Sequence, residues 1–105
     1  MGEISVEELA QWRANGKPFV LLDVREPVEL TLAALPQAVH IPMREIPTRV
    51  TELDPATEFA VICHHGGRSA QVAKFLTQRG FTRVHNVHGG IDAYAKRVDQ
   101  SIPRY

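Results

Sequence analysis

The centre of the sequence reads Phe59-Ala60-Val61-Ile62-Cys63-His64-His65-Gly66-Gly67-Arg68-Ser69. Its first five residues are all apolar, which is typical of a β-strand that is buried on both faces. After the two glycines the pattern changes, because apolar residues recur every three or four positions until Gly80, as in an amphipathic helix. A buried strand therefore leads through a glycine-rich loop into a helix, and units of this kind build parallel sheets.

The flanking sequence repeats this alternation. Further strands are predicted at residues 19–22, 39–41 and 81–87, and helices at 6–15, 27–34, 43–51 and from residue 91 onward. Strands that alternate with helices predict an α/β fold in three layers, with a central parallel sheet of about five strands and helices on both faces. In such folds ligands bind beyond the carboxyl ends of the strands, which is where Cys63 lies.

Composition limits the class of protein. The chain has 105 residues, 44% of them hydrophobic, with 12 Lys and Arg against 12 Asp and Glu. This predicts one domain over residues 1–105 and no field that would attract nucleic acid or an acidic membrane surface. The apolar run at 59–63 is much shorter than the roughly 20 residues of a membrane span. The N-terminus Met1-Gly2-Glu3 leads into no apolar signal segment, so we expect a cytoplasmic protein.

Cys63 is the only cysteine, so it closes no disulfide within the chain. It is a small buried core residue, a link to another chain or a working thiol. The loop after it favours the last, because Gly66 and Gly67 tolerate positive φ and allow backbone N–H groups to point inward. The helix N-terminus and Arg68 would then stabilise a thiolate, which is the nucleophile of covalent catalysis. The alternative is a tight turn with Cys63 in the core.

The segment from Cys63 to Ser69 resembles the active-site loop of single-domain rhodanese sulfurtransferases. Three other segments resemble parts of the same family. Residues 22–29 resemble its Asp-Val-Arg-Glu segment, and residues 40–42 resemble its short strand that ends in proline. Residues 89–94 resemble its terminal Gly-Gly motif. The chain departs from the family at Leu30, at residues 33–37, where a Gly-His-Ile-Pro-Gly stretch is usual, and at Tyr94, where Trp is commoner. These departures affect the walls of the pocket more than the nucleophile.

The resemblance implies a rhodanese-like three-layer domain and a sulfurtransferase. Cys63 would take a sulfane sulfur from a small donor such as thiosulfate, carry it as a persulfide, and pass it to cyanide, a thiol or a protein acceptor. This mechanism is ping-pong and needs no cofactor beyond the covalent persulfide. Arg68 would act with Cys63 by attracting the anionic donor. The remaining loop residues that would bind substrate are His64, His65, Gly66, Gly67 and Ser69.

The resemblance also implies that Asp23 and Arg25 support the loop. The alternative is a structural ion pair at the end of a strand. Cys63 and Arg68 form a Cys-x4-Arg loop, one residue shorter than the Cys-x5-Arg loop of related phosphatases. A shorter loop encloses a smaller group, so we expect sulfur transfer rather than phosphate ester hydrolysis.

Two other interpretations remain. A metal site would combine Cys63 with His64 or His65 and with His85 or His88, but no second cysteine or regular histidine spacing supports it, so no metal is predicted. A rhodanese-like interaction module, or a redox or persulfide sensor, would keep a reactive cysteine without turnover.

Overall fold

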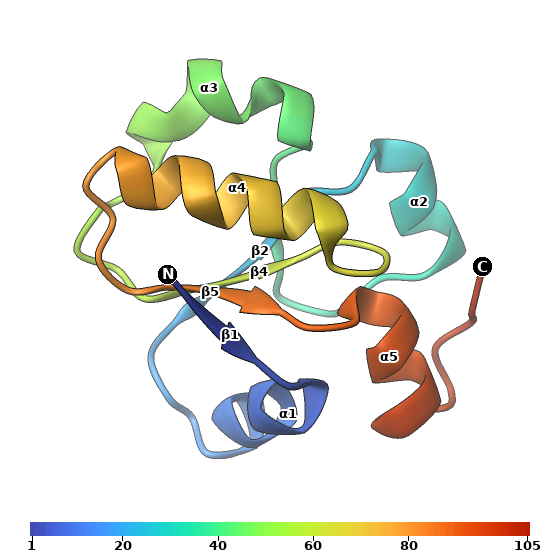
Figure 1. The fold of residues 1–105 in the computed structure, drawn as a ribbon. Coiled ribbons are helices and arrows are strands. Elements are labelled where there is room, and N and C mark those ends of the chain that lie inside the picture. Colours follow the sequence, from blue (N-terminus) through green and yellow to red (C-terminus); the bar gives the residue numbers. More distant parts are fainter.

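The computed structural model describes residues 1–105 and has one five-stranded sheet (Figure 1). The strands are β1 (Gly2–Ile4), β2 (Val20–Asp23), β3 (Val39–His40), β4 (Phe59–Ile62) and β5 (Val84–Val87). Their order is β1-β5-β4-β2-β3, and all neighbours pair in parallel. The predicted α/β fold with a central parallel sheet of five strands is confirmed.

Helices cover both faces of the sheet, as predicted. They are α1 (Val6–Ala14), α2 (Pro27–Leu32), α3 (Ile46–Arg49), α4 (Gly67–Gln78) and α5 (Gly90–Arg97), with 3-10 turns η1 (Met43–Glu45) and η2 (Val50–Glu52) beside α3. Figure 1 shows α3 and α4 on one face, α1 and α5 on the other, and α2 near the C-terminus. α1 begins with the capping box of Ser5 and Glu8, which satisfies backbone N–H groups of its first turn.

The sheet separates two apolar cores, and β4 contributes to both. Val61 packs in the core under α4, while Ala60 and Ile62 pack in the core under α1 and α5. All four residues of β4 are buried, as the continuous apolar run predicts. β4 lies between β2 and β5, so its carboxyl end, followed by Cys63, lies inside the sheet rather than at its edge.

One strand was not predicted, and the bounds of the others differ by one to three residues from those expected. β1 was not predicted, because it has three residues, only Ile4 is buried, and so few positions show no apolar pattern. It lies at the sheet edge and pairs with β5 in the register Gly2↔His85, Glu3↔Asn86 and Ile4↔Val87. β5 begins at Val84 rather than at residue 81, although Phe81 is still buried in the core under α4.

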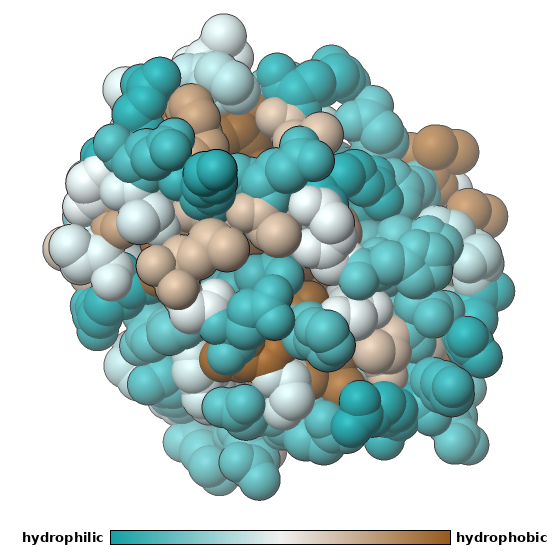
Figure 2. All heavy atoms as spheres, in the orientation of Figure 1, coloured by the Kyte–Doolittle hydropathy of each residue, from teal (hydrophilic) through white to brown (hydrophobic).

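The surface is mainly polar. Figure 2 shows hydrophilic residues over most of the face seen in Figure 1, with smaller apolar patches between them and at the upper right edge. The exposed large apolar side chains include Val28 and Leu32 of α2. None of the helices has the length and apolar character needed to cross a membrane.

Candidate active site

Cys63 directly follows β4 and is 1% exposed. Its Sγ accepts a hydrogen bond from the Gly66 N–H at 3.1 Å, and Ser69 Oγ lies 3.3 Å away. Gly66 has a φ of 107°, which lets the loop turn back onto the sulfur, whereas Gly67 is the first residue of α4 and has no positive φ. N–H groups in the first turn of α4 have no acceptors within the helix. The positive end of the α4 dipole therefore begins beside this loop.

The N-terminus of α5 holds the same loop from the other side. The N–H of Ile91 donates to the carbonyl of Cys63 at 2.9 Å, and that of Asp92 to the carbonyl of His64 at 3.0 Å. Gly90 has a φ of 61°, and a Cβ on it would overlap both of these carbonyl groups. Close approach of the two backbones therefore requires glycine at position 90. The Gly-Gly segment singled out in the sequence thus shapes the Cys63 loop.

Arg68 is paired with a carboxylate. Its guanidinium donates to both oxygens of Glu29 on α2, at 2.5 and 2.9 Å, and the hydroxyl of Tyr105 donates to Glu29 at 2.7 Å. The hydrogen bonds from Arg68 lower the pKa of Glu29 to about 2, despite partial burial, which acts in the opposite direction. The same pairing raises the pKa of Arg68. The cation expected to attract an anionic donor is thus already neutralised by Glu29.

Asp23 and Arg25 form a buried ion pair at the carboxyl end of β2. Arg25 Nη2 lies 2.8 Å from Asp23 Oδ2, and the Arg25 Nε–H donates to Asp23 Oδ1 at 3.0 Å. Both side chains are nearly inaccessible to solvent. The Arg25 guanidinium also donates to the Tyr105 hydroxyl at 3.0 Å and to the Glu29 carbonyl at 3.5 Å. The pair therefore joins β2 to α2 and to Tyr105, which in turn bonds the partner of Arg68.

The two histidines of the loop lie against each other with their rings tilted. The His64 ring lies between that of His65, at a centroid distance of 3.8 Å, and that of Tyr105, at 3.9 Å and nearly parallel. Burial, followed by the neighbouring His65, lowers the pKa of His64. His64 Nε2 is buried and has no hydrogen-bond partner. His65 is well exposed to solvent.

The histidines also approach Asp92. One ligand atom from each of His64, His65 and Asp92 lies within 4.8 Å of the others. Cys63 does not belong to this group, in contrast to the metal site weighed from the sequence. The Asp92 carboxylate is already paired with Arg104 at 3.0 Å.

Four residues around the site were not singled out from the sequence as site residues. Asn86 accepts from Ser69 and donates to Glu3, while Glu29 pairs with Arg68 and accepts a hydrogen bond from Tyr105. Asn86 carries a signal that could have found it, since it is a polar residue inside a buried strand. Tyr105 carries none, because nothing local indicates that it lies over a loop some 40 positions earlier in the chain.

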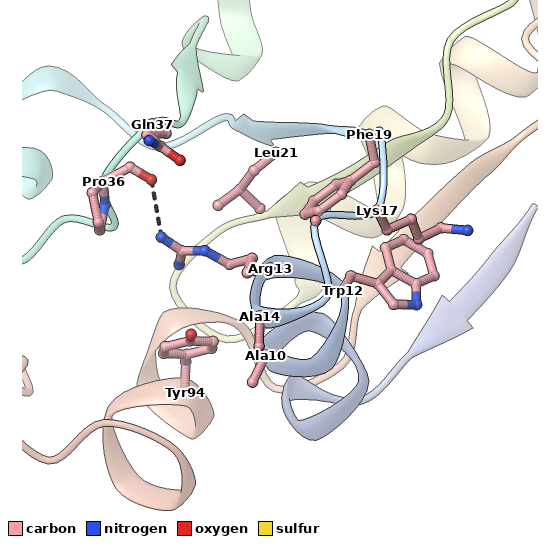
Figure 3. Close-up of a pocket in the computed structure, with 11 residues that line it drawn as sticks. Ala10, Trp12, Arg13, Ala14, Lys17, Phe19, Leu21, Pro36, Gln37 and Tyr94 are labelled. Carbon is pink, nitrogen blue, oxygen red and sulfur yellow. Dashed lines mark hydrogen bonds between the residues drawn. The ribbon is translucent and has the colours of Figure 1, made fainter.

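The main cavity lies elsewhere. It has a volume of about 560 Å³ and lies between α1, the start of β2 and α5, with Trp12, Phe19 and Tyr94 among the side chains that surround it (Figure 3). Arg13 crosses it to donate to the carbonyl of Pro36 at 3.1 Å. Cys63 lines none of the three principal cavities.

Comparison with known proteins finds relatives that match most of this chain. The chain is 45% identical over 111 aligned residues to "Rhodanese-like/PpiC domain-containing protein 12, chloroplastic" of Arabidopsis thaliana, with 98% of this chain but 37% of that protein covered. It is 36% identical to a protein named "Sulfurtransferase" of Allochromatium vinosum, with 91% and 90% of the two chains covered.

Among solved structures, the fold is similar to a rhodanese-like domain protein from Staphylococcus aureus. The TM-score is 0.86 at 30% identity, and the match covers 100% of this chain and 99% of the other. The family model described as "Rhodanese-like domain" matches residues 5–97, which include the carboxyl ends of β2 and β4, the Cys63 loop, and Gly89 and Gly90 at the start of α5. The chain belongs to the rhodanese-like domain family.

Proposed function

We propose that this protein is a sulfurtransferase that carries sulfane sulfur as a persulfide on Cys63. The observation that carries the proposal is the position of Cys63 Sγ, which accepts the Gly66 N–H at the positive end of α4. Partial positive charge at this place stabilises a thiolate or an anionic persulfide. The relative from Allochromatium vinosum that is named a sulfurtransferase supports the proposal.

The reaction proceeds in two displacements. The Cys63 thiolate attacks the outer sulfur of thiosulfate, the S–S bond of the donor breaks, and sulfite leaves with the bonding electron pair. Cyanide or a thiolate then attacks the terminal sulfur of the persulfide and releases the Cys63 thiolate. The scheme is ping-pong and needs no cofactor.

Arg68 supplies positive charge beside the loop, and the pairing with Glu29 reduces its attraction for an anion. Asp23 and Arg25 act indirectly by holding Tyr105 and α2 in place. His64, His65, Gly67 and Ser69 complete the wall that the terminal sulfur would meet.

A second candidate is an interaction or sensing module that keeps a reactive Cys63 without turnover. It is favoured by the match to the Arabidopsis protein, since this chain spans about a third of that protein's length. A domain of this type therefore also occurs as one part of a longer protein.

The mass of the intact, reduced protein before and after thiosulfate separates the two candidates. We expect the gain of one sulfur atom, its absence in Cys63→Ser, and its removal by cyanide or a thiol. A circular dichroism melt of Cys63→Ser serves as the folding control. No gain in the wild type, together with reversible oxidation of Cys63, would favour the sensing module instead.

A further inference from the structure

A chain of hydrogen bonds connects the edge of the sheet to the sulfur of Cys63. Ser69 Oγ lies 3.3 Å from Cys63 Sγ and donates to Asn86 Oδ1 at 2.5 Å. Asn86 Nδ2 donates to Glu3 Oε2 at 3.0 Å across the β1–β5 pairing. Cys63, Ser69 and Asn86 are at most 2% exposed, whereas the Glu3 side chain is 54% exposed.

The direction of this chain follows from the chemistry of its groups. An ionised Glu3 carboxylate only accepts hydrogen bonds, so the Asn86 amide must turn its NH2 group toward Glu3. The Asn86 carbonyl oxygen then faces Ser69 and takes the single hydroxyl proton of that residue. Only lone pairs of Ser69 Oγ remain for the sulfur, so this contact is satisfied when Cys63 is a thiol that donates to Ser69.

Loss of the thiol proton breaks this arrangement. A thiolate or persulfide sulfur has no proton to give to Ser69, so two sets of lone pairs face each other. Ser69 can rotate its hydroxyl toward the sulfur, but the buried carbonyl of Asn86 then loses its donor. A buried acceptor without a partner is costly, so the direction of the chain opposes ionisation of Cys63.

We propose that Glu3 and Asn86 are positioning residues that set the direction of the hydrogen-bond chain through Ser69 and thereby control the ionisation of Cys63. The inference rests on the proposed function in one respect only, namely that Cys63 is the reactive nucleophile. It assigns the edge strand β1 a role in tuning that nucleophile.

Other charged groups surround the chain. Arg68 acts on Cys63 from α4 while paired with Glu29 of α2, and His64 lies next in the loop. The Asp23–Arg25 pair lies at the end of the neighbouring strand β2, and exposed His88 lies 3.4 Å from Glu3. Of these groups only His88 contacts Glu3, so a variant at position 3 removes this exposed contact and leaves the other groups unchanged.

The test is Glu3→Lys, which replaces an acceptor by a pure donor at an exposed position. The Asn86 amide must then turn over, donate to Ser69, and leave the Ser69 hydroxyl free to donate to the sulfur. We expect the pH midpoint of Cys63 alkylation by iodoacetamide to fall by about one unit, the equivalent of one hydrogen bond. Below the midpoint, alkylation becomes about tenfold faster.

Two comparisons separate this effect from simple charge. Glu3→Gln makes half of the charge change, but its carbonyl still accepts from Asn86, so we expect much less than half of the shift. In a Ser69→Ala background the chain is interrupted, and Glu3→Lys should move the midpoint only slightly. A shift proportional to charge, or one of equal size with and without Ser69, would overturn the proposal.

Alkylation does not depend on a sulfur donor. A protein that accepts no sulfur from thiosulfate but shows the shift in Glu3→Lys would contradict the proposed function and support this inference. A protein that accepts sulfur from thiosulfate but shows no shift in Glu3→Lys would support the proposed function and contradict this inference.

Discussion

At the scale of single residues, the loop around Cys63 depends on backbone positions that only glycine occupies without strain. Gly66 turns the loop onto the sulfur with a φ of 107°. Gly90, at a φ of 61°, lets the N-terminus of α5 approach the carbonyl groups of Cys63 and His64. Two positions without a side chain thus determine where the loop places Cys63.

Gly90→Ala should both destabilise the protein and displace the loop. The new methyl group adds steric overlap to a left-handed conformation, so we expect a loss of about 3 kcal/mol in the free energy of unfolding. Gly16→Ala is the matched control, because Gly16 also has a positive φ, of 69°, but a Cβ added there would meet no other atom within 4 Å. The Gly16→Ala variant should lose about 1 kcal/mol in the free energy of unfolding, which is the cost of the left-handed conformation alone. Urea titration measures the free energy of unfolding of both variants. Equal losses in Gly90→Ala and Gly16→Ala would show that Gly90 does not contact the loop.

At the scale of elements, the site depends on how α2 and α4 are joined. Glu29 of α2 and Arg68 of α4 form a bidentate ion pair, and Tyr105 bonds the same carboxylate. The pair positions the N-terminal turn of α4 against α2. Its contribution to stability should depend on pH, since the pKa of Glu29 is lowered to about 2.

Glu29→Gln should reveal this dependence. A carboxyl group whose pKa is lowered by folding stabilises the protein above its ordinary pKa of about 4.5, and this stabilisation is lost as pH falls toward 2. The variant should lose about 1–3 kcal/mol at pH 7, and its difference from wild type should shrink between pH 4.5 and 2.5. Urea unfolding of the variant and the wild type between pH 7 and pH 2.5 measures this difference in the free energy of unfolding.

Glu52→Gln is the control for Glu29→Gln, because the pairing of Glu52 with Arg49 is exposed. Such a surface pair contributes little to stability. A difference between Glu29→Gln and wild type that stays constant down to pH 2.5 would mean that the ion pair does not stabilise the fold.

At the scale of the whole molecule, the central strands hold the two cores together. Leu22 of β2 is fully buried under α4, while its register partner Val39 on the edge strand β3 is 43% exposed. The same substitution at these two neighbouring positions therefore tests which strand is essential for folding.

Leu22→Asp should unfold the domain, because it buries an unpaired charge at a cost of about 4 kcal/mol or more. Val39→Asp should melt cooperatively within a few degrees of wild type, because water still reaches the carboxylate. Thermal melts followed by circular dichroism distinguish the two variants. A cooperative melt of Leu22→Asp near the wild-type temperature would contradict burial of β2 on both faces.

Local patterns were sufficient to predict much of the structure. The apolar run at Phe59–Ile62, the change of period in α4 and the positive φ of Gly66 were all predicted, because periodicity and glycine placement act over a few neighbouring residues. The position of Cys63 at the carboxyl end of a buried strand followed from the same patterns. The short strand β1 was missed because three residues at an edge show no period.

The surroundings of Cys63 were decided by tertiary structure alone. Arg68 meets Glu29 from 39 positions away, and Asn86 meets Glu3 from 83 positions away. The second contact exists only because β1 and β5, near opposite ends of the chain, are neighbours in the sheet. Local hydrophobic periodicity and residue type were enough to predict the fold class and to mark Cys63 as the candidate nucleophile. Which charges and hydrogen bonds surround that nucleophile depends on strand order, and no local pattern encodes that order.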